Sequence, residues 1–232
     1  MKLALIENDP DSGPGRLTDW LPGATVLRAH AGEKVPTATD FDGFVLLGGG
    51  FMPDADHEAP WLPAERDLIN AAVATGTPLL GICLGAQLLA HTCGGAVRSA
   101  YGLPEKGVTP LRVSPAAAGD AVFGGLPGEV RAVESHQDQI TALPPDAVWL
   151  MSSQRVPHQA FRVGSAAWGV QFHPEASGQR VQSWSDDSIR SRGFDPDQVR
   201  AEAASAADEL EDTWSAWFAR FVDLCVTRQG LR

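Results

Sequence analysis

Basic clusters and long apolar runs are both missing from this 232-residue sequence. Its 18 Lys and Arg residues are outnumbered by 29 Asp and Glu residues, which gives a formal net charge of −11, and the basic residues are scattered along the chain. Nucleic acids and anionic membrane surfaces are bound by basic patches, so we expect neither as a partner. No stretch of eighteen apolar residues is present, which argues against a membrane-spanning helix.

Cysteine is also scarce. Cys83, Cys93 and Cys225 are odd in number and widely separated, a spacing that fits neither a disulfide framework nor a zinc site. The apolar run from Leu3 to Ile6 is too short for a signal peptide, and no cleavage pattern follows it. We therefore expect a cytoplasmic protein with free thiols, and the sequence indicates no metal and no cofactor.

Apolar strand-like runs alternate with helical patterns early in the chain and follow one another closely later. The predicted strands are Leu3–Glu7, Thr25–His30, Gly43–Leu47, Pro78–Ile82, Val108–Val113, Val130–Glu134, Val148–Ser152, Gln159–Val163 and Ala167–Phe172. The predicted helices are Leu17–Leu21, Ala64–Ala74 and the segment after Cys83. Apolar strands separated by helices are typical of a mostly parallel sheet covered on both faces, and the later strands indicate an antiparallel extension. The predicted fold class is therefore α/β.

The stretch PLLGICLGAQ, residues 78–87, places Cys83 between two glycines where an apolar strand ends and a helix begins. A sharp strand-to-helix turn requires small neighbours and lifts its central side chain out of the sheet. The N-terminus of the following helix lowers a thiol pKa from about 8.5 toward neutrality. We expect Cys83 to be a nucleophile at an exposed turn, with the Leu84 amide as an oxyanion donor; the alternative is a packing corner with an inert cysteine.

A second glycine-rich turn, Gly48–Gly50, follows another predicted strand. Ligands of such sheets bind beyond the carboxyl ends of the strands, and Cys83 lies at one of these ends as well. A backbone without Cβ atoms can approach a substrate closely. We therefore expect Gly49 and Gly50 to supply the second oxyanion donor.

A candidate base ends the last predicted strand, in the sequence Val-Gln-Phe-His-Pro-Glu at residues 170–175. Residues two apart on an extended backbone face the same way, and Pro174 holds that geometry. Glu175 can then bind one ring nitrogen of His173 while the other faces a thiolate. Cys83, His173 and Glu175 are the candidate catalytic triad, although nothing in the local sequence brings His173 to Cys83.

Residues 1–176 resemble the class I glutamine amidotransferases, a family of glutaminase domains with a Cys-His-Glu triad. Residues 78–87 and 169–175 match two family signatures in full. Gly48–Gly50, Ala59–Leu62 and Glu65 are similar to stand-alone members related to the glutaminase domain of guanylate synthase. The resemblance implies a flavodoxin-like three-layer sandwich.

Two shorter segments resemble the family with departures. Glu105-Lys106-Gly107 resembles a Glu-Ile-Gly segment, with lysine in place of the apolar residue. Residues 135–138 resemble a Ser/Trp-His-x-Asp segment, with Gln137 where relatives often have glycine. These departures bear on the substrate contacts and not on the triad.

The resemblance implies a thioester mechanism. Cys83 would attack the side-chain amide of glutamine and form a γ-glutamyl thioester, and His173 would protonate the ammonia and then activate water. Gln87 would contact the α-groups of the substrate with its amide, or alternatively serve only as polar packing. The segment Ser135, His136 and Gln137 would offer backbone groups to the same end of the substrate.

The remaining residues, 177–232, are predicted to form a C-terminal extension. Asp195 is a candidate helix cap, with Pro196 at the first helical position. The apolar residues that follow recur every three or four positions and predict an amphipathic helix. If this helix continued to Arg228 it would be about 48 Å long at 1.5 Å per residue, which implies a bend, an overhang or a partner.

The long helix packs either on its own domain or on another protein. Trp214 and Trp217 favour docking, and an oligomer formed through this helix is one expectation. Lys106 and the polar segment 184–193 would either dock a partner or shape a pocket for a larger amine.

Three functions are compatible with these features. The favoured one is a glutaminase that delivers ammonia to a separate synthase. The second is a γ-glutamyl hydrolase or peptidase that cleaves a γ-glutamyl amide. The third is a non-catalytic binding protein on the same fold, which the complete triad disfavours.

Overall fold

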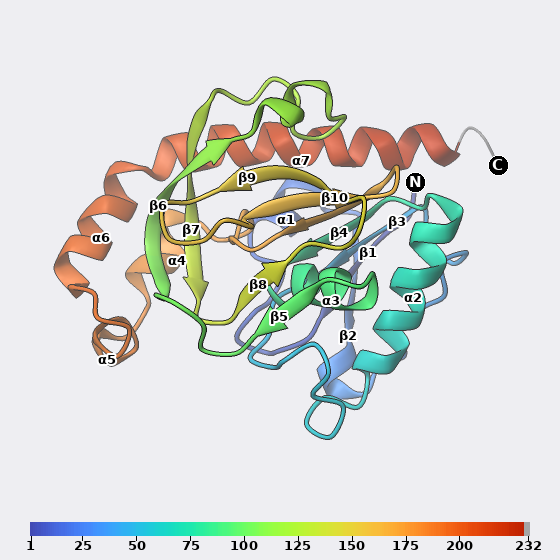
Figure 1. Ribbon diagram of the computed structural model, residues 1–232, viewed down its shortest axis with the longest axis horizontal. Helices are drawn as coiled ribbons and strands as arrows, with labels where there is room; N and C mark the ends of the chain where they lie inside the picture. Colours follow the sequence, from blue (N-terminus) through green and yellow to red (C-terminus); the bar gives the residue numbers. More distant parts are fainter. Residues whose placement is uncertain (230–232) are drawn as a thin grey trace.

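A nine-stranded mixed sheet lies at the centre of the computed structural model, which describes residues 1–229 (Figure 1). The strand order is β2-β1-β3-β4-β11-β10-β9-β6-β7. The parallel strands are β1 (Leu3–Glu7), β2 (Thr25–Arg28), β3 (Gly43–Leu46), β4 (Leu79–Ile82) and β11 (Ala167–Val170). The antiparallel strands are β6 (Glu105–Val113), β7 (Glu129–His136), β9 (Val148–Ser152) and β10 (Ala160–Val163). The predicted parallel sheet with an antiparallel extension is confirmed.

Helices cover both faces of the sheet because successive residues of its parallel strands point to opposite sides. Leu3 and Leu5 belong to the core cluster that includes α7 (Ala207–Gln229). Ala4 and Ile6 belong to the other cluster, which includes α2 (Leu62–Thr75) and α3 (Leu84–Thr92). Figure 1 shows α7 along one side of the sheet and α2 and α3 on the other. The predicted three-layer α/β sandwich is confirmed.

Short elements complete the chain, and several of them were not predicted. A separate two-stranded sheet pairs β5 (Ala96–Arg98) with β8 (Gln139–Ala142). The predicted strand Thr25–His30 ends early, because η1 (Ala29–Ala31) begins after Arg28. The other short helices are α1 (Leu17–Trp20), η2 (Pro115–Gly119), α4 (Gly178–Gln182) and α5 (Asp186–Arg190). No helix within residues 1–229 combines the length and the apolar character needed to cross a bilayer.

The C-terminal helix is broken, which corrects the expectation of one continuous helix. Asp195 accepts a hydrogen bond from the Gln198 amide and caps α6 (Pro196–Ser205), as predicted. The chain then breaks at Ala206 and continues as α7. The break allows α6 to pack against α4 and β6 while α7 runs along the sheet. The last residues of the predicted extension, 230–232, lie outside the described residues.

The tryptophans of α7 face inward. Trp214 and Trp217 are both 0% exposed, and Trp214 packs against Phe172 with ring centroids 4.6 Å apart. The indole Nε1 of Trp214 donates to the carbonyl of Arg131 on β7. These two side chains therefore belong to the core of this chain, and the expectation that they serve docking is wrong.

Candidate active site

Cys83 lies in a strained turn between β4 and α3. Its backbone has φ 51° and ψ −103°, a region that side chains other than glycine rarely adopt. The glycines beside it are required by contact: a Cβ atom at Gly81 would lie 2.3 Å from the carbonyl oxygen of Gly85, and one at Gly85 would lie 2.2 Å from that of Leu46. The glycines thus allow the strand, the turn and the helix to pack closely enough to form the turn.

The Cys83 side chain is more enclosed than the sequence predicted. Cys83 is only 8% exposed and joins the core cluster on the α7 side of the sheet, so the expectation of an exposed turn is wrong. The cause is tertiary, because Gln171, which follows β11, donates a hydrogen bond to the sulfur at 3.6 Å. Gln171 belongs to the same signature as His173, and no separate pattern in the sequence singles it out.

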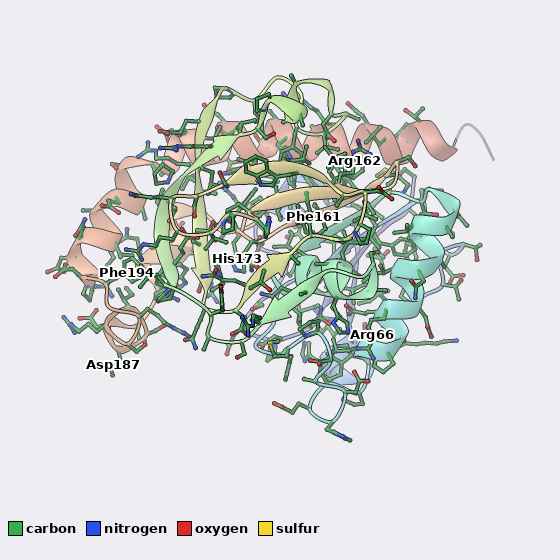
Figure 2. All side chains as sticks on the ribbon, in the orientation of Figure 1. Arg66, Phe161, Arg162, His173, Asp187 and Phe194 are labelled. Carbon is green, nitrogen blue, oxygen red and sulfur yellow. The ribbon has the colours of Figure 1, made fainter. Side chains whose placement is uncertain are left out.

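His173 and Glu175 are joined by a hydrogen bond between Nδ1 and Oε1 of 2.7 Å. Figure 2 shows His173 near the middle of the molecule. Burial alone lowers the pKa of His173, but the Glu175 carboxylate and Cys83 raise it by more, so the pKa lies well above its usual value. Because Cys83 contributes to this shift, the fold brings together the three side chains of the predicted triad.

The backbone on either side of His173 is also held in place. The His173 amide donates to the carbonyl of Val133 on β7, and the Arg16 amide donates to the carbonyl of Glu175. The buried guanidinium of Arg16 donates to the carbonyl of Pro174. These bonds hold the His-Pro-Glu segment from two sides, and no local pattern predicted that Arg16 contributes.

The candidate oxyanion donors lie beside Cys83. A Cβ atom at Gly48 would be 3.7 Å from Cβ of Cys83 and 3.3 Å from Cε1 of His173. A Cβ atom at Gly49 would be 2.8 Å from the Leu84 side chain. The Gly50 amide instead donates to Oδ2 of Asp9 at 3.4 Å. Gly49 and Leu84 therefore flank the cysteine as predicted, whereas the Gly50 amide is engaged elsewhere in this conformation.

Gln87 lies on the first turn of α3 and is 3% exposed. Its amide nitrogen donates to the carbonyl of Asp138 at 3.4 Å and to Oε1 of Gln171 at 3.3 Å. Since Gln171 in turn contacts Cys83, a chain of polar groups runs from α3 to the sulfur. Both predicted roles, substrate contact and polar packing, are compatible with this position.

The predicted segment at the end of β7 splits into two environments. Ser135 accepts a hydrogen bond from Nζ of Lys106 at 2.8 Å. The His136 ring points inward, where Nε2 lies 3.2 Å from Glu105 and 3.3 Å from Glu134. Gln137 is partly exposed in the turn that follows. Only backbone groups of His136 are free to meet a substrate, because its ring is committed to the two carboxylates.

The carboxylates around His136 form a buried charged cluster. Burial lowers the pKa of His136, but Glu105 and Glu134 outweigh it and the pKa rises to about 10. Burial raises the pKa of Glu134 to about 7 despite the nearby His136. Ligand atoms of Glu105, Glu134 and His136 lie within 4.8 Å of one another, close enough to hold a metal ion. The oxygens of Glu105, however, already accept hydrogen bonds from Ser153 and Gln159.

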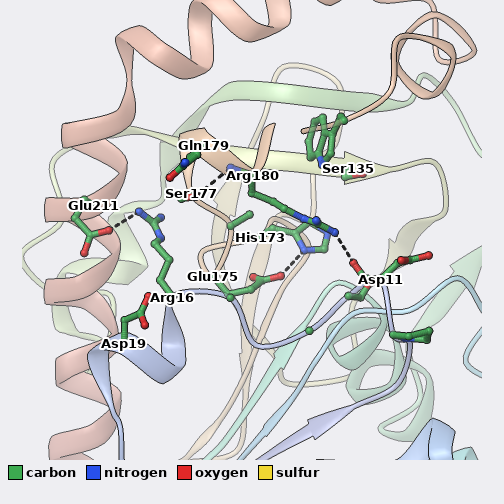
Figure 3. Close-up of a pocket in the computed structure, with 16 residues that line it drawn as sticks. Asp11, Arg16, Asp19, Ser135, His173, Glu175, Ser177, Gln179, Arg180 and Glu211 are labelled. Carbon is green, nitrogen blue, oxygen red and sulfur yellow. Dashed lines mark hydrogen bonds and ion pairs between the residues drawn. The ribbon is translucent and has the colours of Figure 1, made fainter. Parts of the chain in front are cut away.

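A cavity of about 750 Å³ opens beside His173 and Glu175 (Figure 3). Its walls come from the loop after β1, the end of β7, α4 with the loop that follows it, and α7. Figure 3 shows Glu175 turned toward His173, Arg16 turned toward Glu211, and Arg180 bonded to the backbone of Asp11. The sequence did not predict this cavity, because its walls are far apart in the chain.

Comparison with known protein families gives a match to the model described as glutamine amidotransferase class-I, over residues 24–188. The chain is 36% identical over 152 residues to a glutamine-hydrolysing GMP synthase of Thermomicrobium roseum, an alignment that covers 62% of this chain and 27% of the relative. It therefore spans about a quarter of the length of that relative. In Thermoplasma acidophilum, one subunit of a glutamine-hydrolysing GMP synthase is 37% identical over 135 residues, with 58% of this chain and 63% of the relative covered.

Two further comparisons extend over most of the chain. The glutamine amidotransferase-like protein YfeJ of Salmonella typhimurium is 32% identical over 192 residues, which cover 78% of this chain and 79% of the relative. The crystal structure of a glutamine amidotransferase from Thermotoga maritima superposes with a TM-score of 0.85 at 24% identity and covers 96% of this chain and 98% of that one. The fold, including the C-terminal helices, is thus shared with a solved structure.

Proposed function

This chain belongs to the class I glutamine amidotransferase family, and on that premise we propose that it hydrolyses the side-chain amide of glutamine through a thioester on Cys83. The observation that carries this proposal is the 2.7 Å bond between His173 and Glu175, on a ring whose pKa is also raised by Cys83. A protonated imidazole beside a sulfur stabilises the thiolate, which is the nucleophilic form.

In the first half-reaction, the Cys83 sulfur forms a bond to the amide carbon. The negative charge on the carbonyl oxygen is stabilised by the amides of Leu84 and Gly49. The carbon–nitrogen bond then breaks as the nitrogen takes a proton from Nε2 of His173. Ammonia leaves, and the γ-glutamyl group remains as a thioester.

In the second half-reaction, His173 takes a proton from water as the water oxygen attacks the thioester carbon. The carbon–sulfur bond breaks and glutamate leaves. Glu175 holds the ring in position and stabilises its charged form in both steps, without a bond to the substrate. Gln87 and the backbone of residues 135–137 hold the α-groups of glutamine.

We further propose that the ammonia passes to a separate synthase in the cytoplasm. Support comes from the relatives, because this chain matches about a quarter of a whole GMP synthase but 63% of a GMP synthase that is divided into subunits. The acceptor chemistry would then belong to the partner protein.

A glutaminase assay of the purified protein tests the amide hydrolysis. We expect glutamate and ammonia in equal amounts from the wild-type protein and none from Cys83→Ala. An electrophilic glutamine analogue should label Cys83 alone, with Cys93 and Cys225 as internal controls. Turnover by Cys83→Ala at a near-normal rate, or labelling of another cysteine, would remove the thioester mechanism.

A second candidate function uses the same chemistry on a larger substrate. The cavity of about 750 Å³ is lined by His173, the residue that protonates the leaving nitrogen, and ammonia alone would not fill it. A γ-glutamyl amide with a substituted nitrogen would place its amine there. Faster cleavage of such an amide than of glutamine by the purified protein would favour this candidate.

A further inference from the structure

The cavity beside His173 has a cationic end that the hydrolysis of glutamine does not use. Nζ of Lys106, on β6, donates to Ser135 Oγ at 2.8 Å and lies 3.9 Å from the centroid of the Trp184 ring. Ser135 and Trp184 both line the cavity, as does Arg180 on α4. Lys106 therefore stands directly behind the cavity wall, at the end where Arg180 also lies.

These cations have no counter-ion within residues 1–229. No carboxylate there lies within ion-pair distance of Lys106, Arg180 or Arg192. Burial, with smaller contributions from the neighbouring Arg192 and Arg180, lowers the pKa of Lys106 to about 8. A partly buried, unpaired cation is costly, and a bound anion would relieve both the burial and the repulsion. In a chain with a net charge of −11, three such cations in one place point to a ligand.

The place of the anion in the reaction follows from His173. The leaving nitrogen must lie beside the ring that protonates it, so any group attached to that nitrogen extends into the cavity that His173 lines. We propose that this cavity binds the leaving amine of a γ-glutamyl amide, and that Lys106 and Arg180 bind a carboxylate carried by that amine. The substrate class is thus a γ-glutamyl amino acid or short peptide. This inference rests on the second candidate function.

The charges of the remaining walls favour a carboxylate over a phosphate. Glu211 is paired with Arg16 at 2.8 Å, but Asp11 and Asp19 also line the cavity. Two aspartates would repel a dianion more strongly than a singly charged group. The bond changes are those of the thioester mechanism, in which the amine leaves with the proton from His173 and water then releases glutamate.

Matched substrates test the proposal. γ-Glutamylglycine and γ-glutamylglycinamide differ only in the charged carboxylate, and the β-alanine and 4-aminobutanoate homologues extend its reach. We expect kcat/KM of the wild-type protein to favour the acid over its amide by about tenfold or more at the best length, as one charge-assisted contact provides. A ratio near one at every length would overturn the carboxylate site.

Two variants assign the preference to residues. Lys106→Met keeps the length of the side chain without its charge, and Arg180→Gln removes a charge from an exposed position. The ratio of the two kcat/KM values is measured within each variant, so a general loss of activity cancels. We expect each variant to bring the ratio toward one, and the matched control Arg190→Gln, on α5, to keep it. An unchanged ratio in both variants would overturn the assignment.

Binding to Cys83→Ala separates this inference from the proposed function. Calorimetry with the same pair of ligands measures the carboxylate preference without turnover. Tighter binding of the acid, by a protein whose wild-type form hydrolyses neither amide, would keep the anion site and reject the hydrolase. Hydrolysis of both amides at equal rates, with equal binding, would keep the hydrolase and reject the anion site.

Discussion

Glu175 acts through His173 in the proposed mechanism, so its loss should be partial. The substitution Glu175→Gln keeps a group that can hydrogen-bond to Nδ1 of His173, which now lies 2.7 Å from Oε1. The negative charge that raises the pKa of His173 would be gone. We expect a smaller loss of kcat/KM than the roughly 10²–10⁴-fold loss expected for His173→Ala.

The pH profile distinguishes this role from a structural one. Removing the carboxylate lowers the pKa of His173, so the alkaline limb of the kcat/KM profile should move to lower pH in Glu175→Gln. Glu129→Gln, at an exposed position of β7, serves as the control and should keep the wild-type profile. A loss equal to that of His173→Ala would mean that Glu175 itself contacts the substrate.

At the scale of elements, α7 stabilises the sheet through its aromatic side chains. Trp214 is fully buried, contacts Phe172 and Trp217, and donates to the carbonyl of Arg131. Truncation of a buried tryptophan costs about 3–5 kcal/mol of unfolding free energy. We expect a loss of that size in urea unfolding of Trp214→Ala, and little change for Asp212→Ala on the exposed side of the same helix. A loss below about 1 kcal/mol for Trp214→Ala would show that α7 contributes little to the core.

At the scale of the whole molecule, buried Glu65 makes stability depend on pH. Its side chain is 0% exposed, and Asn8 donates to one carboxylate oxygen at 3.4 Å. Burial raises the pKa of Glu65 from its usual 4.5 to about 8. Between these values the folded chain keeps a proton that the unfolded chain has lost. The unfolding free energy contributed by this group therefore falls as pH rises, by roughly 1 kcal/mol per pH unit.

The substitution Glu65→Gln removes this dependence, because glutamine stays neutral. We expect the variant and the wild-type protein to be similar in stability near pH 4.5, and the variant to be the more stable near pH 8. Urea unfolding across this range measures the difference, and Glu58→Gln, an exposed neighbour on the surface, should match the wild-type protein throughout. A constant difference between Glu65→Gln and wild type would contradict the raised pKa.

Dependence on a partner is the other property of the whole molecule. The Gly50 amide is held by Asp9 and does not contribute to the oxyanion site in this conformation. We expect the lone protein to hydrolyse glutamine slowly, and a synthase that reorders the Gly48–Gly50 loop to raise kcat. Steady-state kinetics with and without the candidate synthase measure this effect. Fast, partner-independent cleavage of a γ-glutamyl amide with poor activity on glutamine would favour the second candidate function.

The sequence by itself determined the local parts of the protein. Alternating apolar strands and helices predicted the α/β sandwich, because period and burial are coupled. The glycines at 81 and 85 predicted the turn at Cys83, since no side chain fits there. His-Pro-Glu predicted the bond between His173 and Glu175, because two residues on an extended strand share a side. Each of these features depends on residues close together in the chain.

Only the tertiary structure decided what distant segments do to one another. The enclosure of Cys83 depends on Gln171, 88 positions away, and the inward position of Trp214 depends on Phe172 and Arg131. The cationic end of the cavity joins β6 to α4 and to the loop that follows it. Contacts of this kind are made by packing between elements, and no local pattern records which elements meet. The triad was therefore visible in the sequence, whereas the cavity behind the proposed substrate class was not.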